Sequence, residues 1–351
     1  MQATMRAKAR APARIAAALV AIAGVGSVAS AQGEVNIYSY REPQLIDPLL
    51  KAFTTKTGIR TNVVFASAGL NERLAAEGKN SPADVLLTVD AGRLSEAKDA
   101  GLTQAIDSPV LKTIPAQLRD AGNHWFGLTM RARVVYASKE RVKQDAITYE
   151  ELADPKWKGK ICIRSGQHVY NTSLIATLIA HKGEAYAEQW LKGVKANLAQ
   201  KPAGGDREQV RDVRNGKCDL AIGNTYYMAL MMTNEKNPEQ KEWAGAVKIL
   251  FPNASDRGTH VNISGVALAK NAPNRTNGIA LVEFLASDEA QQLYATANNE
   301  YPVSTKVKPS QIVQGWGPLK ADKLPLDNIA KYRKRASELV DKAGFDAGPS
   351  S

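Results

Sequence analysis

Alternating strand and helix signals constrain the fold of this chain more than any other feature. The run at 84–89 is continuously apolar, as in strands that are buried on both faces of a parallel sheet. The expected strands are 35–38, 60–65 and 84–89, and the expected amphipathic helices are 44–57, 70–77 and 92–100. A strand-helix-strand-helix order of this kind predicts a parallel sheet covered by helices on both faces.

A second α/β block follows a long strand-like run at 125–138. Its expected strands are 160–163 and 219–222, and its expected helices are 170–181, 184–196 and 207–215. A long strand-like run lies at 260–268, and the tail at 326–343 is expected to be helical and charged on its exposed face. Two α/β blocks joined by extended runs near residues 130 and 260 predict two lobes linked by crossing strands. Ligands are then expected in the cleft between the lobes.

The first 31 residues have the pattern of a signal peptide. Four basic residues at 6–14 precede an alanine-rich apolar stretch at 15–28, and residues 29–31 form a small-residue cleavage site. We expect the mature chain to begin at Gln32 and to be exported to the periplasm. No cysteine stands at the cleavage point, so we expect no lipid anchor. Without the leader, the formal net charge falls from +11 to +7.

The roughly 320 residues that remain exceed the size at which a single core stops growing, which again favours two lobes. Basic residues are interspersed with acids and form no arginine-aromatic stripe, so we expect no nucleic-acid partner. Cys162 and Cys218 both lie in strand-like runs. In an oxidising compartment they are candidates for one disulfide, and the sequence leaves two buried thiols open as the alternative.

The motifs of several enzyme classes are absent. The sequence contains no G-x-S-x-G, no H-E-x-x-H, no phosphate-binding loop and no G-x-G-x-x-G after a strand. Its four histidines lack metal-ligand spacing, and we expect each to be a surface or hydrogen-bonded residue. We therefore expect a binding protein rather than an exported enzyme that uses acids in the cleft.

Three tyrosines lie where strands give way to helices. Tyr226 and Tyr227 follow one short apolar run, with Asn224 or Thr225 placed to cap the next helix, and Tyr170 begins another helix. Helix N-termini favour negative charge, so phenolates are stabilised there. Three phenolates that converge suit a hard trivalent cation such as Fe³⁺. The residues alone leave both packing and metal binding open.

Longer sequence runs resemble the ferric-iron-binding periplasmic proteins of ABC transporters, the bacterial transferrin-like group. The resemblance covers nearly all of the mature chain, and it is specific as a combination rather than run by run. The runs that carry it are 37–41 (IYSYR), 81–85 (SPADV), 88–90 (TVD), 125–127 (WFG), 131–133 (RAR), 149–152 (YEEL), 154–159 (DPKWKG), 224–227 (NTYY) and 258–262 (GTHVN).

The resemblance implies the two-lobed, type II periplasmic-binding-protein fold, an α/β fold with mixed sheets flanked by helices and hinge strands that cross between the lobes. We expect an N-terminal lobe of residues 32–130 plus 255–304, and a C-terminal lobe of residues 131–254 plus 305–351. The partner that the resemblance implies is an inner-membrane ABC permease, and we expect a monomer. The alternative is a binding protein of the same fold for an organic or oxyanion solute, such as a polyamine, thiamine, sulfate or phosphonate.

The resemblance also implies the ligand set. Tyr170, Tyr226 and Tyr227 fall on the phenolate ligand positions of the family. Many relatives place a further histidine or tyrosine ligand after the N-terminal run, but here that stretch reads Arg41-Glu42-Pro43. This departure favours the branch with three tyrosines, in which carbonate or another small anion completes the coordination.

An anion of this kind needs cationic partners. Arg131 and Arg133 alternate on one strand face and have guanidinium groups that fit carbonate, and Arg41 is a third candidate. The alternative for each arginine is an ion pair with a carboxylate of its own lobe. Further cleft residues expected near the site are Tyr40, Glu42 and Asn224.

Overall fold

The computed structural model describes Gln2 and residues 33–349. The predicted leader, residues 1–31, lies outside the described residues apart from Gln2. The described residues from 33 onward belong to one compact unit. Among the helices of the described part, none combines the length and the apolar character that crossing a membrane requires.

One end of this unit, called the first lobe here, is built on a parallel sheet. Its strands β1 (Glu34–Ser39), β2 (Arg60–Phe65) and β3 (Val85–Thr88) lie in the order β2-β1-β3, and β9 (Val261–Ala269) joins β3 in the antiparallel sense. The parallel part of the sheet confirms the prediction from the strand and helix order. The two-residue strands β4 (Thr103–Gln104) and β10 (Tyr301–Pro302) extend the sheet.

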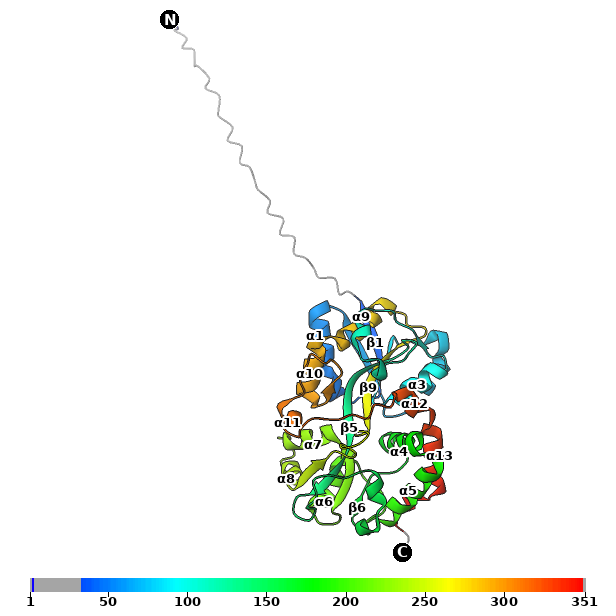
Figure 1. The fold of residues 1–351 in the computed structure, drawn as a ribbon. Coiled ribbons are helices and arrows are strands. Elements are labelled where there is room, and N and C mark those ends of the chain that lie inside the picture. The colour runs from blue at the N-terminus through cyan, green and yellow to red at the C-terminus, as the bar shows by residue number, and fades with distance from the viewer. Residues whose placement is uncertain (1, 3–32, 350–351) are drawn as a thin grey trace. The chain divides into compact units, whose positions relative to one another are not determined.

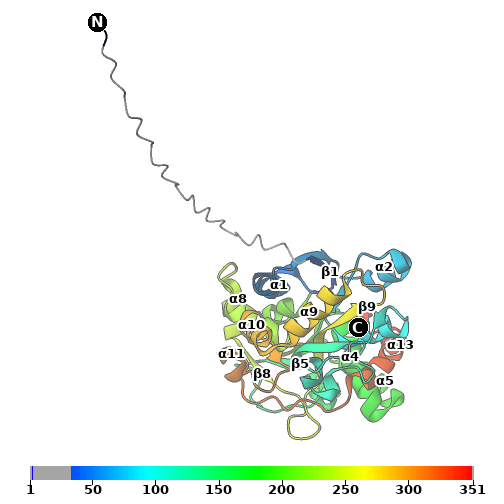
Figure 2. The same cartoon turned by 90° about the horizontal axis from the view of Figure 1, so that it is seen from above.

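Helices cover both faces of the first-lobe sheet. They are α1 (Pro43–Thr57), α2 (Leu70–Glu77), α3 (Ala91–Asp99), α9 (Arg275–Ala286) and α10 (Asp288–Asn298). Figure 2 shows α1 and α2 on opposite sides of β1. Side chains alternate along β1, so Ile37 joins the core that contains α1 and α9, whereas Tyr38 joins the core of α2 and α3.

Strand β5 (Phe126–Ser138) passes from the first lobe to the other end of the unit, called the second lobe here (Figure 1). Its first part, up to Ala132, pairs with β9, and from Arg133 onward it pairs with β7 (Leu220–Asn224) and β8 (Val247–Leu250). The predicted crossing strands near residues 130 and 260 are therefore confirmed as β5 and β9. The residue limits of the two lobes stay a prediction.

The second lobe repeats the α/β plan. Strand β6 (Ile161–Cys162) is parallel to β7 at the edge of the sheet. The helices of this lobe are α4 (Val169–Lys182), α5 (Glu184–Ala196), α6 (Asp206–Arg214), α7 (Thr225–Met232) and α8 (Glu239–Gly245). Cys162 of β6 and Cys218 form a disulfide, with their Cα atoms 5.8 Å apart. The alternative of two free thiols is thereby excluded.

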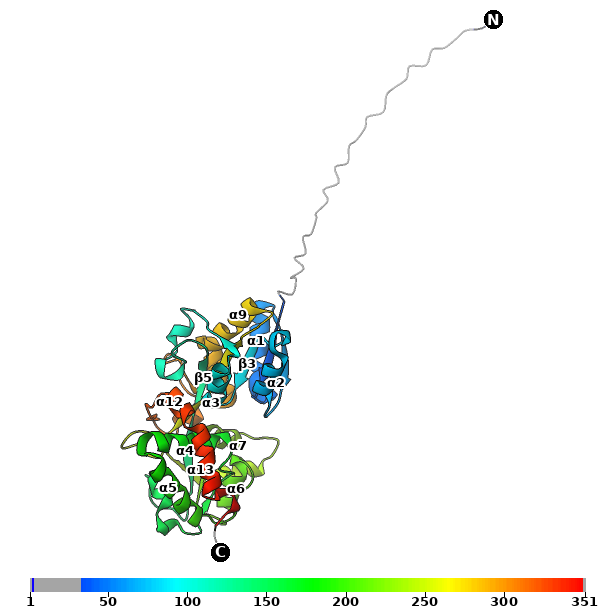
Figure 3. The ribbon, with the colours of Figure 1, turned by 90° about the vertical axis from the view of Figure 1, so that its right-hand side faces the viewer.

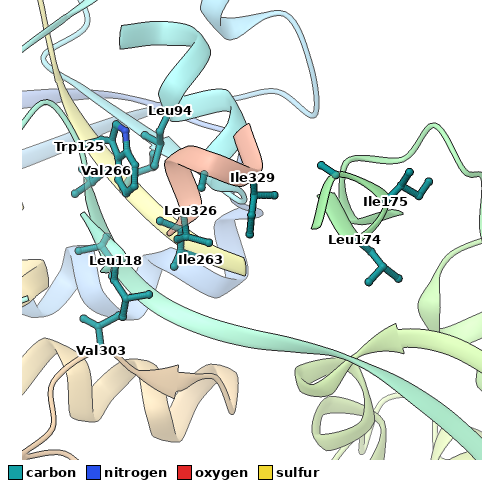
Figure 4. Close-up of a cluster of buried hydrophobic side chains, with 14 of the residues drawn as sticks. Leu94, Leu118, Trp125, Leu174, Ile175, Ile263, Val266, Val303, Leu326 and Ile329 are labelled. Atoms are coloured by element: carbon teal, nitrogen blue, oxygen red, sulfur yellow. The ribbon is translucent and has the colours of Figure 1, made fainter. Parts of the chain in front are cut away.

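The C-terminal tail is helical, as predicted, but it is divided into two helices. It forms α12 (Leu326–Lys331) and α13 (Arg333–Lys342), which are separated by Tyr332, and the short α11 (Gln311–Gln314) precedes them. Figure 3 shows α13 along the second lobe and α12 between the lobes. Figure 4 shows Leu326 and Ile329 of α12 between Leu94 of α3 and Leu174 of α4. The break lets the tail pack on both lobes, a tertiary requirement that helical spacing does not reveal.

Candidate metal centre

Three phenols lie together on the second-lobe side of a cavity of about 180 Å³. Tyr170 belongs to the first turn of α4, and Tyr226 and Tyr227 belong to the first turn of α7. The Oη atoms of Tyr170 and Tyr226 are 3.2 Å apart. The rings of Tyr226 and Tyr227 have centroids 4.2 Å apart. The structure thus brings together the three tyrosines that the sequence singled out.

Both lobes line this cavity. Its walls are Tyr40, Arg41, Glu42, Leu45, Phe65, Ser67, Val89 and Arg93 from the first lobe, and Arg164, His168, Val169, Tyr170, Arg207, Tyr226 and Tyr227 from the second. The phenols therefore come from one lobe only. Glu42 is the only acidic residue among these lining residues, whereas four arginines line the cavity. The positive potential of the cavity favours an anion, or a cation whose charge the phenolates neutralise.

Local contacts position the helix starts that carry the phenols. His168 caps α4, because its Nδ1 accepts a hydrogen bond from the backbone N–H of Tyr170 at 3.3 Å. Asn224 holds the capping position of α7, but its side chain makes no capping hydrogen bond. Its Oδ1 instead accepts a hydrogen bond from Arg133. Thr225, the other predicted cap, accepts a hydrogen bond from the backbone N–H of Ala132.

The environment of the phenols disfavours ionisation while no cation is bound. Burial raises the pKa of Tyr226 well above its ordinary value, and the neighbouring Tyr170 and Tyr227 raise it further. Burial, followed by Tyr170, also raises the pKa of Tyr227. At neutral pH these two side chains are therefore protonated in the metal-free protein. A hard cation has to displace their protons in order to bind.

Two of the three predicted anion-binding arginines already have a carboxylate partner. Arg41 donates to Glu300 Oε1 at 2.8 Å, and Arg133 donates to Asp206 Oδ2 at 2.6 Å. Burial raises the pKa of Asp206, but Arg133, Arg164 and the backbone N–H of Asn224 act together against it and help to leave that pKa below its ordinary value. The alternative of an ion pair within the protein is thus realised for Arg41 and Arg133.

Arg131 differs from the other two arginines. It is buried, and it forms no ion pair with any carboxylate of the described residues. Its guanidinium donates to Ser264 Oγ at 3.0 Å and to the carbonyl oxygen of Val89. Its Cζ lies 5.8 Å from the ring centroid of Tyr170. Arg131 therefore brings an unneutralised positive charge next to the phenols.

Three further arginines contact the site and were missed by sequence reasoning. Arg207 lies 4.9 Å from the ring centroid of Tyr227, and Arg164 lies 5.5 Å from that of Tyr170. Arg93 lies over Tyr40 at 4.2 Å. Arg164 follows strand β6 and Arg207 lies in the first turn of α6, so the strand-end and helix-start rule that found the tyrosines would have found these two as well.

The other predicted cleft residues have separate roles. The Tyr40 hydroxyl accepts a hydrogen bond from the backbone N–H of Asn71 at 2.8 Å, which keeps it on the first-lobe side. Glu42 lines the cavity, is exposed and accepts a hydrogen bond from Gln44. Asn224 lies behind the phenols, where it contacts Arg133 instead of lining the cavity.

Side chains of the usual metal-binding types do not cluster elsewhere. Within the described residues, no group of three or more His, Cys, Asp or Glu side chains is arranged to hold a metal ion. Each of the four histidines has a hydrogen-bond partner, as expected from the sequence; the pairs are His124 with Thr103, His168 with Tyr170, His181 with Asp322 and His260 with Thr177. The phenols remain as the candidate donor set for a hard cation.

The chain is similar to known bacterial solute-binding and iron-binding proteins. The model of a bacterial extracellular solute-binding protein family matches residues 80–315. "Iron uptake protein A1" of Synechocystis sp. is 44% identical over 317 residues, which cover 90% of this chain and 88% of that protein. The apo ferric ion-binding protein A of Pasteurella haemolytica is 51% identical with a TM-score of 0.85, covering 89% of this chain and 98% of that one. A Trichodesmium protein in complex with iron and citrate ligands is 43% identical with a TM-score of 0.85, covering 89% and 100%.

Proposed function

The chain belongs to the bacterial extracellular solute-binding protein family, and we propose that it captures ferric iron in the periplasm for uptake. Members of this family are solute-binding proteins and not enzymes. Its structural relatives are two-lobed periplasmic binding proteins, which agrees with the fold class predicted from the sequence. The names of the relatives, an iron uptake protein and a ferric ion-binding protein, support the choice of iron as cargo.

One observation carries the proposal: three phenols converge on a cavity that is otherwise rich in arginine. Phenolate oxygens are hard donors and suit Fe³⁺ better than ferrous iron or softer cations. Tyr170, Tyr226 and Tyr227 would supply three negative charges, which match the trivalent ion. Because binding releases phenolic protons, we expect the affinity for iron to fall as the pH falls.

A small synergistic anion would complete the coordination, and carbonate is our proposal for it. Arg131 is the candidate whose charge is not neutralised, since it forms no ion pair among the described residues, whereas Arg41 is the candidate that lines the cavity. Arg41 and Arg133 also keep a buried Nε–H that has no hydrogen-bond partner within the described part of the chain. Guanidinium N–H groups of this kind bind planar oxyanions well. The Trichodesmium relative, which holds citrate together with iron, supports an anion beside the metal.

Delivery is proposed to occur at an inner-membrane ABC permease, with the protein acting as a monomer. Closure of the lobes around iron would present a surface that differs from the open form, and the permease would favour release. Reduction of the bound ion would also favour release, because ferrous iron has a weaker preference for phenolate.

Titration with ferric citrate in bicarbonate buffer tests the proposal. We expect a reddish phenolate-to-iron charge-transfer band that saturates at one iron per protein. Tyr226→Phe and Tyr227→Phe should each keep the fold and weaken iron retention. Tyr301→Phe is the matched control, because the Tyr301 hydroxyl lies outside the cavity and has no hydrogen-bond partner in the described part.

The competing function is the binding of an organic or oxyanion solute in the same cleft. A thermal-shift screen of ferric citrate against spermidine, thiamine, sulfate and a phosphonate separates the two. A colourless mixture without bound iron, together with stabilisation by one of the other solutes, would refute the ferric proposal.

A further inference from the structure

We propose that Arg133 is a positioning residue for the iron site: its guanidinium fixes the three helix starts that set the geometry of the phenols. This inference rests on the proposed ferric function of the same site. It gives Arg133 a role different from that of Arg131, although both residues lie on the same face of β5.

Arg133 lies at the point where β5 leaves one pairing partner for another. Ala132 is the last residue of β5 that pairs with β9, and Arg133 is the first that pairs with β7, opposite Asn224. A side chain at this point reaches the ends of several second-lobe elements at once. The guanidinium has five N–H donors in a rigid plane, so it can hold several acceptors in a fixed arrangement.

Each contact of Arg133 leads to a different helix start. Its NH1 donates to Asp206 Oδ2 at 2.6 Å and to Asn224 Oδ1 at 3.1 Å, and its NH2 donates to Asn171 Oδ1 at 2.8 Å. Asn171 follows Tyr170 in α4, Asn224 precedes the first turn of α7 that holds Tyr226, and Asp206 begins α6. One side chain therefore fixes both phenol-bearing helices relative to each other.

The acceptors are themselves held by other bonds. Asp206 Oδ2 also accepts the backbone N–H of Asn224 at 2.8 Å, and Asp206 Oδ1 accepts Arg164 at 3.1 Å. The Asn171 amide donates to the carbonyl oxygens of Arg164 and Ser165 at 3.1 and 2.9 Å. The network is closed around Arg133, so a shift at one helix start is transmitted to the others.

The burial of this network indicates that it fixes the positions of the helix starts rather than adding to the net stability of the fold. Arg133, Asp206, Asn171 and Asn224 are all at most 3% exposed. A buried ion pair offsets its own desolvation poorly, and an apolar replacement of both partners is often as stable. What the network does supply is a fixed separation between the Tyr170 and Tyr226 hydroxyls, which are 3.2 Å apart. A trivalent ion bound by both is sensitive to that separation.

The test compares Arg133→Lys with Arg141→Lys in the full chain, using ferric citrate over a series of bicarbonate concentrations. Lysine keeps the charge but lacks the rigid planar fork that spans these three acceptors, so we expect a shifted charge-transfer maximum and an affinity loss of about tenfold or more. Arg141 is the matched control, because its guanidinium also joins several second-lobe acceptors, at Asp219, Val213 and Cys218, but none at a phenol-bearing helix. Arg141→Lys should lose stability without a shift of the band.

Asn171→Ala and Asn224→Ala provide a second route if Arg133→Lys does not fold. Each removes one acceptor only, and each should shift the band in the same direction. Combining Asn171→Ala with Arg133→Lys should add little to the loss from Arg133→Lys alone, since both changes break the same contact.

The outcomes separate the two proposals. If the wild-type protein develops no band, the ferric function itself is wrong. If the wild-type protein develops the band but Arg133→Lys and both asparagine variants keep its maximum and their affinity within about twofold, the positioning role is wrong. A loss that additional bicarbonate restores would also overturn the positioning role, because it would assign Arg133 to the anion.

Discussion

At the scale of single residues, the buried His260 makes the stability of the fold depend on pH. Burial, together with the nearby Arg133 and His181, lowers the pKa of His260 to about 3. Its Nδ1 shares a hydrogen bond with Thr177 Oγ1 at 2.9 Å. The folded protein therefore keeps His260 neutral across a range in which the unfolded chain binds a proton, with an ordinary pKa of about 6.5.

This difference predicts acid sensitivity of the metal-free protein. Well above pH 6.5 both states are neutral at His260 and its full contribution to stability is present, and stability falls as the pH decreases through 6.5 toward 3. Between pH 7 and pH 5 we expect a loss of about 2 kcal/mol from His260. Urea unfolding at the two pH values measures it. His260→Asn should remove this step and leave the similar step of His168, whose pKa is also lowered to about 3 by burial and Arg164; an unchanged pH dependence would contradict the assignment.

Sequence reasoning found the phenols and part of their surroundings, namely Tyr40, Arg41 and Glu42, but it missed the other arginines of the cavity. A tyrosine pair after a short apolar run is conspicuous, and the family resemblance assigned it a role. Arg93 is inconspicuous in a chain with 46 basic residues, because only its folded contact with Tyr40 separates it from surface cations. Arg164 and Arg207 were missed although a strand end and a helix start mark their positions. The ion pairs of Arg41 and Arg133 join residues 259 and 73 positions apart, and no local pattern encodes such pairings.

At the scale of elements, the disulfide anchors β6, the shortest strand of the second lobe. Strand β6 has two residues and lies at the sheet edge, and Cys162 connects it to Cys218 across a sequence separation of 56. A strand of this length contributes few backbone hydrogen bonds of its own. The covalent bond fixes its place beside the start of β7, the strand that leads into the phenol-bearing α7.

Removal of this bond should lower stability without changing the iron site. The Cys162→Ala/Cys218→Ala double variant is expected to lose about 2 to 4 kcal/mol of unfolding free energy, since a loop of this length constrains the unfolded chain strongly. Urea unfolding measures the loss. A reductant should destabilise the wild-type protein and leave the double variant unaffected. An altered charge-transfer band in the double variant would show that the disulfide also shapes the site.

Elements with strong periodicity were predicted almost to the residue. Strand 60–65 and helices 70–77 and 184–196 match the structure at both ends. The tail at 326–343 is helical as predicted, but the prediction did not show the break at Tyr332, after which α13 follows α12. The spacing of apolar residues shows which face of a helix is buried. It does not show that α12 packs on α3 and α4 whereas α13 packs on α4 and α5.

At the scale of the whole molecule, Arg333 connects the lobes at a distance from the phenols. Arg333 begins α13, which packs on α4 of the second lobe. Its guanidinium forms ion pairs with two first-lobe carboxylates: Glu96 of α3 at 2.8 Å, and Asp90, which directly precedes α3, at 3.5 Å. Gly92 leaves room for it, because a Cβ at that position would lie 1.9 Å from Arg333 NH1. Arg333 thus favours the lobe separation at which both lobes line the cavity.

Arg333→Ala should shift the molecule toward a more open form. Loss of a partly exposed ion pair is worth about 1 kcal/mol, so we expect an iron affinity about fivefold weaker with an unchanged charge-transfer maximum. Small-angle scattering should show a larger radius of gyration for the metal-free variant. Arg335→Ala is the control, because its partners Glu184 and Glu338 belong to the second lobe. Equal effects of the two variants would contradict a role between the lobes.

The placement of all three phenols on the second lobe has a kinetic consequence. An ion that meets this lobe finds the complete proposed phenolate set before the first lobe arrives, so the encounter rate does not depend on lobe movement. Escape, in contrast, requires the first-lobe wall of Arg41, Phe65 and Arg93 to withdraw. Changes in the hinge should therefore alter the residence time of the cargo and leave its capture rate nearly constant.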